Sequence, residues 1–236
     1  MEILFFLAAF FSEVVGTIAG FGSSTIFLPL ALLFFDFKKA LILVALFHIF
    51  GNLGRIGFFR FGLDKNTLIK FGLPSVIFTL IGALLVSYIP QNFLKAILGV
   101  FLILYSLVAL WQGNLSVKET ITNSLVGGSL SGFLAGLIGT GGALRGAFLT
   151  AFGLPKEKYI ATSAAIALAV DLTRIPIYLS QGFLKSNLYW YIPVLLIIAL
   201  IGSFTGKQIV KIIPQKQFKK VVLVAILIIG IKFVIK

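Results

Sequence analysis

Apolar runs long enough to cross a lipid bilayer recur along the whole chain of 236 residues. A helix needs about 20 apolar residues to cross the hydrocarbon layer. The runs are separated by charges, prolines or polar clusters, and their approximate limits are 4–34, 40–59, 68–88, 92–111, 121–153, 159–180, 188–210 and 218–235. The pattern predicts an all-α polytopic membrane protein of about eight transmembrane or re-entrant helical segments.

The charge content supports this class. Charged residues make up 11% of the chain and hydrophobic residues 59%, whereas a soluble domain carries about a quarter charged residues. We therefore expect a multi-pass protein of the cell (inner or plasma) membrane, in contact with lipid. The net charge of +13 is what a membrane protein gains from Lys and Arg retained in cytoplasmic loops. We expect no nucleic-acid partner.

Two runs are too long for one simple span, and both are interrupted by glycine. The run 4–34 contains Gly20-Phe21-Gly22-Ser23-Ser24, and the run 121–153 contains "GLIGTGGALRG". Backbone groups freed by such a break are tolerated at membrane depth only when buried in protein or lining a wet cavity. The N-terminus of the following half-helix attracts anions. We interpret Gly139–Gly142 with Thr140 as a break that faces substrate, and the spacing of Gly16–Gly20 and Gly132–Gly136 as close helix packing.

Four short matches in the same order divide the chain into two related halves. "GTIAG" at Gly16 matches "GFLAG" at Gly132, Arg55-Ile56 matches Arg174-Ile175, Leu73-Pro74 matches Ile192-Pro193, and "YIPQNFLKAIL" from Tyr88 matches "IIPQKQFKKVVL" from Ile212. We predict two homologous four-segment repeats, 1–112 and 119–236, within one integrated membrane domain. Transporters are commonly built in this way, with the substrate site at the repeat interface.

The sequence leaves two membrane arrangements open. If all eight segments cross, one side carries ten Lys or Arg in its loops and the other seven; if 4–34 and 121–153 dip in and return, the count is eleven against six and the repeats are inverted. The charge rule does not separate these counts. Both arrangements place Lys156 and Lys158 in the cytoplasm and both chain termini outside, and they differ over Lys38 and Lys39.

Ionisable residues inside membrane spans are costly and mark functional sites. Away from loops and termini the chain has Glu13, Arg55, Arg145, Asp171 and Arg174, together with His48 and Asn52. Three positive charges against two negative ones leave one positive charge unmatched, which suits an anionic ligand. His48, Asn52 and Arg55 share one helix face, as do Ser163, Ala167, Asp171 and Arg174, so the two faces are expected to line one cavity.

Several of these residues also have plain structural interpretations. Asp171 and Arg174 are three residues apart and can neutralise each other, and Arg55 and Arg174 can extend to the headgroups. Glu13 can carry a proton or pair with an arginine, and His48 can be a hydrogen-bonded packing residue. Arg145 has no nearby carboxylate in sequence, and guanidinium binds oxyanions through two parallel hydrogen bonds. Arg145 is therefore the strongest single candidate for an anion ligand.

The residues of Gly136–Leu168, "GLIGTGGALRGAFLTAFGLPKEKYIATSAAIAL", and their weaker counterpart at Gly20–Leu46 make the chain resemble the sulfite exporter TauE/SafE family, small permeases built from two related halves. The matching pattern is a glycine cluster, a basic link and an Ala-Thr-Ser on the next helix, here Gly139, Gly141, Gly142, Lys156, Ala161, Thr162 and Ser163. The chain departs from the pattern at Ser23 and Ser24, which replace glycines. The resemblance implies transport of sulfur-containing anions such as sulfite or organosulfonates.

The expected function is that of a membrane permease for small anions, with sulfur oxyanions as the expected substrates, working by secondary transport with alternating access. The alternatives are a passive anion channel and a non-transporting membrane scaffold. No catalytic motif is present, so an enzyme is not expected, and neither is a cofactor or a metal site. The expected substrate-binding residues are Ser23, Ser24, Thr25, Asn52, Arg55, Gly139, Thr140, Gly141, Gly142, Arg145, Thr162, Ser163 and Arg174. Glu13, His48 and Asp171 are the candidates for proton coupling.

Overall fold

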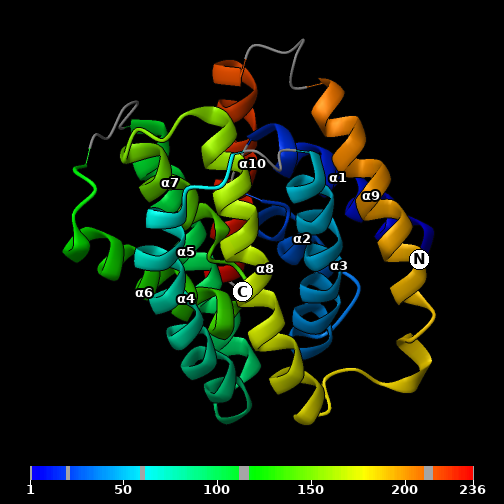
Figure 1. The fold of residues 1–236 in the computed structure, drawn as a ribbon. Helices are drawn as coiled ribbons and strands as arrows, with labels where there is room; N and C mark the ends of the chain where they lie inside the picture. Colours follow the sequence, from blue (N-terminus) through cyan, green and yellow to red (C-terminus); the bar gives the residue numbers. More distant parts are fainter. Residues whose placement is uncertain (1, 20–21, 59–61, 112–116, 210–214, 236) are drawn as a thin grey trace.

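The computed structural model describes residues 2–19, 22–58, 62–111, 117–209 and 215–235, and within these ranges it contains helices and no strand (Figure 1). The all-α expectation is confirmed. The first half of the chain contains α1 (Glu2–Ala19), α2 (Ser24–Ala31), α3 (Phe37–Phe58), α4 (Lys65–Leu85) and α5 (Gln91–Trp111). The second half contains α6 (Ile121–Ile138), α7 (Gly142–Ala151), α8 (Lys156–Ser180), α9 (Tyr191–Ile209) and α10 (Gln215–Ile235). Short 3-10 turns at Val86–Tyr88 and Ser186–Leu188 follow α4 and precede α9.

Both long apolar runs are divided into two helices, as their glycines predict. Helix α1 ends at Ala19 and α2 begins at Ser24, and Gly22 between them has a φ of +86°. Helix α6 ends at Ile138, and Gly139 follows it with a φ of +73°. Residues with a Cβ rarely adopt this left-handed conformation, so glycine is what allows the chain to turn at both points.

Each divided segment returns to the side from which it entered. The ring of Phe5, in the first turns of α1, lies 5.0 Å from the ring of Phe35, which follows α2. In the second half the backbone N–H of Val117, ahead of α6, donates to the carbonyl of Ala151 at the end of α7 over 3.0 Å. The segments are therefore re-entrant, and the alternative in which all eight segments cross is wrong.

Contacts between loops show which connections share a side. Asp64 forms an ion pair with Lys158 at 3.6 Å, and the hydroxyl of Thr67 donates to Glu119 at 2.9 Å. At the other end the backbone N–H of Phe37 donates to the side chain of Gln91 at 2.9 Å. Helix α3 therefore crosses in the direction opposite to α8, which is the geometry of inverted repeats.

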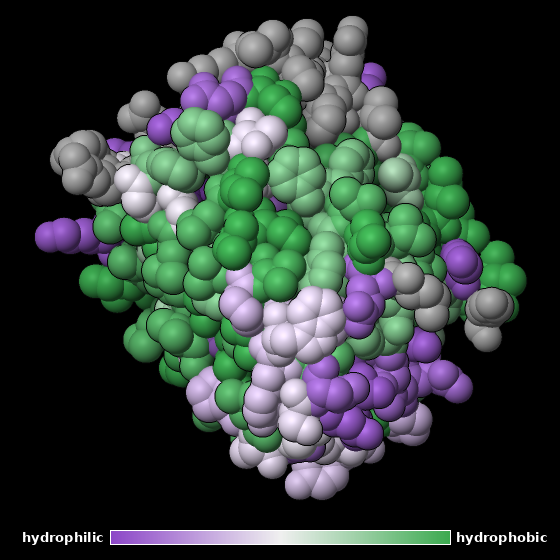
Figure 2. Space-filling model, turned by 90° about the vertical axis from the view of Figure 1, so that its right-hand side faces the viewer, coloured by the Kyte–Doolittle hydropathy of each residue, from purple (hydrophilic) through white to green (hydrophobic). Residues whose placement is uncertain are grey.

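Six helices within the described residues are long and apolar enough to cross a membrane. The helical stretches that meet this test are Phe37–Phe58, Lys65–Tyr88, Gln91–Trp111, Ile121–Ile138, Lys158–Ser180 and Ser186–Ile209, and the described apolar part of α10 is Val222–Ile235. Figure 2 shows one face on which apolar side chains cover the middle and hydrophilic side chains gather mainly at the lower end. This distribution suits a protein surrounded by lipid.

Glycines on α6 bring its backbone against that of α4. A Cβ added at Gly132 would lie 2.0 Å from the carbonyl oxygen of Ser75, and one at Gly136 would lie 2.3 Å from that of Thr79. The hydroxyl of Thr79 also donates to the carbonyl of Gly132 at 3.0 Å. The packing interpretation of Gly132–Gly136 is confirmed, whereas Gly20, the partner of Gly16, lies outside the described residues.

The two halves exchange their packing partners. Helix α4 of the first half packs along α6 of the second, and α9 of the second half packs along α1 of the first. On α9 the close approach is again made by glycine, because a Cβ at Gly206 would meet the side chain of Thr17 at 2.8 Å. The division into two repeats stays a prediction. Two related halves would be expected to pack against each other in this reciprocal way.

Candidate anion site between the two interrupted segments

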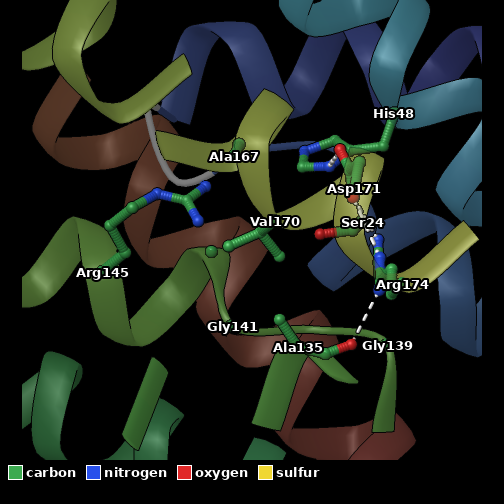
Figure 3. Close-up of a pocket in the computed structure, with 11 residues that line it drawn as sticks. Ser24, His48, Ala135, Gly139, Gly141, Arg145, Ala167, Val170, Asp171 and Arg174 are labelled. Carbon is green, nitrogen blue, oxygen red and sulfur yellow. Dashed lines mark hydrogen bonds and ion pairs between the residues drawn. The ribbon is translucent and has the colours of Figure 1, made fainter. Parts of the chain in front are cut away.

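A small cavity lies where the interrupted segments meet α3 and α8 (Figure 3). Its volume, measured as the space open to the centre of a water molecule, is about 10 Å³, which is room for about one water. Its lining residues come from both halves of the chain: Ser24, His48, Ala135, Gly139, Gly141, Gly142, Arg145, Ala167, Val170, Asp171 and Arg174. Eight of these eleven are among the residues expected from the sequence to bind substrate or protons.

The glycine cluster supplies backbone donors at the cavity. Helix α7 begins at Gly142, and its first helical bond runs from the N–H of Arg145 to the carbonyl of Gly141 at 2.9 Å. The N–H groups of Gly142, Ala143 and Leu144 therefore precede the helix's own hydrogen bonding. Gly141, at the N-cap, has no side chain that could accept from them. These donors, together with the helix dipole, make this end of α7 attractive to an anion.

Arg145 extends from the first turn of α7 toward the cavity (Figure 3). Its side chain is buried, and its Nε donates to the hydroxyl of Ser163 on α8 at 3.0 Å. Within the described ranges no carboxylate lies within 4 Å of its guanidinium, whereas Arg55 and Arg174 each have one. The unmatched positive charge expected from the residue count is therefore that of Arg145.

Asp171 on α8 is the centre of a buried polar network. One carboxylate oxygen accepts from Arg174, at 2.9 Å from Nε and 2.7 Å from the second terminal nitrogen. The other lies 2.9 Å from Nδ1 of His48 and 3.2 Å from the side-chain nitrogen of Asn52, both on α3. The expected neutralisation of Asp171 by Arg174 is confirmed. The network also joins α3 of one half to α8 of the other.

Glu13 and Arg55 form a second buried pair beside the cavity. The guanidinium of Arg55 donates to Oε1 of Glu13 at 2.8 Å, and the hydroxyl of Ser203 donates to the same oxygen at 2.6 Å. Both charged side chains are buried, as is Arg174. The alternative in which Arg55 and Arg174 extend to the lipid headgroups is therefore wrong. Of the two roles that the sequence allows for Glu13, carrying a proton or pairing with an arginine, the structure shows the second.

The remaining expected residues lie around the cavity and not on its wall. The hydroxyls of Thr25 and Thr140 bond each other at 2.8 Å, and Ser23 accepts a long bond of 3.5 Å from Arg55. Thr162 has a different contact: its hydroxyl accepts a hydrogen bond from the backbone N–H of Asp64 at 2.9 Å. Its contact is with the loop before α4, not with the cavity.

Three polar contacts around the buried charges carry no clear sequence signal. The carbonyl of Ala135 accepts from Arg174 at 2.8 Å, and the hydroxyl of Tyr178 donates to the carbonyl of Gly136 at 2.5 Å. These carbonyls belong to the last turn of α6, which lacks helical partners for them. Ser203 lies in an apolar stretch of α9, and only the small pair Gly202-Ser203 in that stretch indicates a close contact.

Comparison with known proteins points to a family of membrane transporters. A family model described as "Sulfite exporter TauE/SafE" matches residues 5–233. The chain is 26% identical over 228 residues to a probable membrane transporter protein of Methanocaldococcus jannaschii, an alignment that covers 89% of this chain and 85% of that protein. No solved structure matches the chain. Because the family model covers nearly its whole length, the chain belongs to the sulfite exporter TauE/SafE family of membrane transporters.

Proposed function

We propose that this membrane transporter moves a small oxyanion, of the sulfite or organosulfonate class, by alternating access through the cavity at Arg145. The observation that carries the proposal is the buried guanidinium of Arg145, which faces the N-terminus of α7 without a carboxylate partner among the described residues. A buried positive charge of this kind is costly unless something negative compensates for it. A bound oxyanion supplies that compensation.

The chemistry of the cavity wall suits a tetrahedral or pyramidal oxyanion. Guanidinium donates through two parallel N–H groups, and the first turn of α7 offers backbone N–H donors from a second direction. The hydroxyl of Ser24 lines the opposite part of the wall, on α2. Donors from both halves therefore converge on one small volume, with more of them from the second half.

The size of the cavity supports alternating access. Room for about one water is too little for an oxyanion with four or five heavy atoms, so the lining elements must separate before substrate enters. The two re-entrant segments are the elements whose separation widens the cavity. The hydroxyls of Thr25 and Thr140 join these segments by a hydrogen bond, and Leu28 of α2 lies close to Gly139, whereas α4 and α6 are packed backbone to backbone.

The distribution of Lys and Arg gives the proposed transporter an orientation in the membrane. The side that contains 60–70, 112–119, 154–158 and 207–220 carries eleven Lys or Arg in the sequence, so we place it in the cytoplasm. Both chain termini and the loop at Lys38 then lie outside. The alternative of a passive channel makes the same placement but predicts flux that follows the electrochemical gradient alone.

The test is uptake of labelled sulfite, thiosulfate and methanesulfonate into proteoliposomes. Arg145→Gln is expected to reduce saturable uptake at least tenfold, and Arg145→Lys to restore part of it, because lysine keeps the charge but not the paired donors. Lys185→Gln removes the same charge from an exposed loop and serves as the matched control. Uptake by a correctly folded Arg145→Gln protein at the wild-type rate contradicts the proposal.

A further inference from the structure

Resting on the proposed function, we infer that His48 is the group that couples protons to anion movement: a proton on Nε2 and the anion enter the cavity together. His48 lines the cavity, is 3% exposed and extends from α3 toward the Arg145 side (Figure 3). Its Nε2 is buried and has no hydrogen-bond partner among the described residues. A buried imidazole nitrogen without a partner can form a hydrogen bond with a ligand.

The partner of the other ring nitrogen decides what Nε2 can bind. Nδ1 lies 2.9 Å from the carboxylate of Asp171, which is also ion-paired with Arg174 and therefore accepts hydrogen bonds only. The Nδ1 position must then carry the hydrogen. In the neutral ring Nε2 is consequently an acceptor, and its lone pair repels an anion. In the protonated ring Nε2–H becomes a donor. Nε2 lies beside Gly22, at the break between α1 and α2, and the ring lines the cavity.

The charged groups around His48 make proton and anion depend on each other. Asp171 and Arg174 face it from α8, Arg55 from its own helix α3 and Arg145 from α7, and Arg55 is itself paired with Glu13 of α1. The three arginines outnumber the two carboxylates, so the net positive charge around His48 opposes protonation of its ring. An anion in the cavity offsets that opposition, and the protonated ring in turn holds the anion, so each promotes binding of the other.

The same geometry argues against the other two candidates for proton coupling. Glu13 accepts at one oxygen from both Arg55 and Ser203, and Asp171 accepts from Arg174 at one oxygen and from α3 at the other. Protonating either carboxylate leaves a buried arginine without its charged partner, which is strongly unfavourable. Protonating His48 breaks none of these bonds. The proton comes from water on the side where the anion enters and leaves with it on the other side.

The test uses methanesulfonate, which keeps its single charge throughout the range in which histidine titrates. Binding to the purified full-length protein is measured by thermal shift and calorimetry between about pH 5 and pH 8. For the wild type, affinity is expected to rise about tenfold per unit of falling pH where one proton is taken up. His48→Gln places a permanent amide donor near Nε2 and is expected to bind with little pH dependence. His48→Asn reaches Asp171 but not the cavity and is expected to bind weakly at every pH.

A second measurement needs no variant. Methanesulfonate added to wild-type protein in weak buffer at about pH 7.5 is expected to remove about one proton per bound anion from solution, by the same linkage. Binding without proton uptake, or an unchanged pH slope in His48→Gln, overturns the role of His48 and leaves the anion site standing. Absence of binding of any sulfur oxyanion at any pH overturns the proposed function itself. Lys95→Gln, outside the cavity, controls for a general change in surface charge.

Discussion

The hydroxyl groups of Thr25 and Thr140 lie 2.8 Å apart and join the two re-entrant segments in the interior of the protein. Both side chains are fully buried. Replacing either threonine by valine leaves the other hydroxyl without a partner, which costs about 1–3 kcal/mol of unfolding free energy. We expect the double variant to lose less than the sum of the single losses, because it leaves no orphaned hydroxyl. Denaturant unfolding in detergent measures all three, with Thr205→Val, whose bond stays within α9, as control.

Close packing of α4 on α6 predicts a strong effect at Gly132. Gly132→Ala places a Cβ 2.0 Å from the carbonyl oxygen of Ser75, so the two helices must separate or the variant must unfold more easily. Gly57→Ala is the matched control, because a Cβ there meets nothing within 4 Å. Alanine favours a helix over glycine by about 1 kcal/mol, so the control is expected to be neutral or slightly stabilised. Equal melting temperatures for the two variants contradict the close packing of the helices.

The ion pair between Glu13 and Arg55 predicts an asymmetry between single and double variants. Glu13→Gln leaves the buried guanidinium of Arg55 without a negative partner and is expected to destabilise the protein by about 3–5 kcal/mol. Combining it with Arg55→Gln removes the orphaned charge and is expected to recover part of that loss. Thermal unfolding of the two single variants and the double variant gives the coupling energy. Strictly additive losses would show that the two side chains do not interact in the membrane.

Asp64 predicts a local pH response at the start of α4. Its carboxylate accepts the backbone N–H of Thr67 at 3.0 Å, and this bond, helped by Lys158, lowers the pKa of Asp64 below its usual value of 3.8. The stabilisation is therefore fully present above pH 3.8 and is lost as pH falls through the lower pKa of the folded state. Asp64→Asn keeps a capping oxygen but not the charge. Hydrogen exchange of the first amides of α4 should accelerate at acid pH in the wild type only.

Re-entry of both segments predicts the accessibility of two lysine positions. The chain has no cysteine, so a single introduced thiol reports its own side without background. Lys38→Cys is expected to react with an impermeant thiol reagent in intact cells. Lys118→Cys is expected to react only after the membrane is opened, because its loop contacts the start of α4 on the opposite side. Reaction of both from the same side contradicts the inverted arrangement.

The sequence was sufficient to predict the helices and the two interruptions, because their signals are local. Run lengths placed most helix ends within a few residues, and the breaks fell at glycines that adopt positive φ, Gly22 and Gly139. Arg145 is the strongest sequence candidate for the same reason, since its position after the glycine cluster and its lack of a neighbouring carboxylate are visible in the chain.

The partners of the other charges depend on packing across the sequence. Glu13 and Arg55 are 42 positions apart and His48 and Asp171 are 123 apart, and no spacing rule on one helix relates such pairs. The sequence also does not determine whether the side chain of Arg174 is buried, because a long side chain at that position can either reach the lipid headgroups or bend inward. The carbonyl of Ala135, at the end of α6, favours the inward conformation because it accepts a hydrogen bond from Arg174.

Helix α4 packs on α6, and α9 packs on α1, so the main contacts of these helices run between the two halves of the chain. The glycine-lined faces of α6 and α9 belong to the second half and are covered by α4 and α1 of the first half, so each half should be unstable when made alone. A chain cut between Trp111 and Val117 and produced as two polypeptides is therefore expected to reassemble into a working transporter only when both pieces enter the same membrane. An ancestor encoded as two separate genes, inserted in opposite directions, satisfies the same requirement.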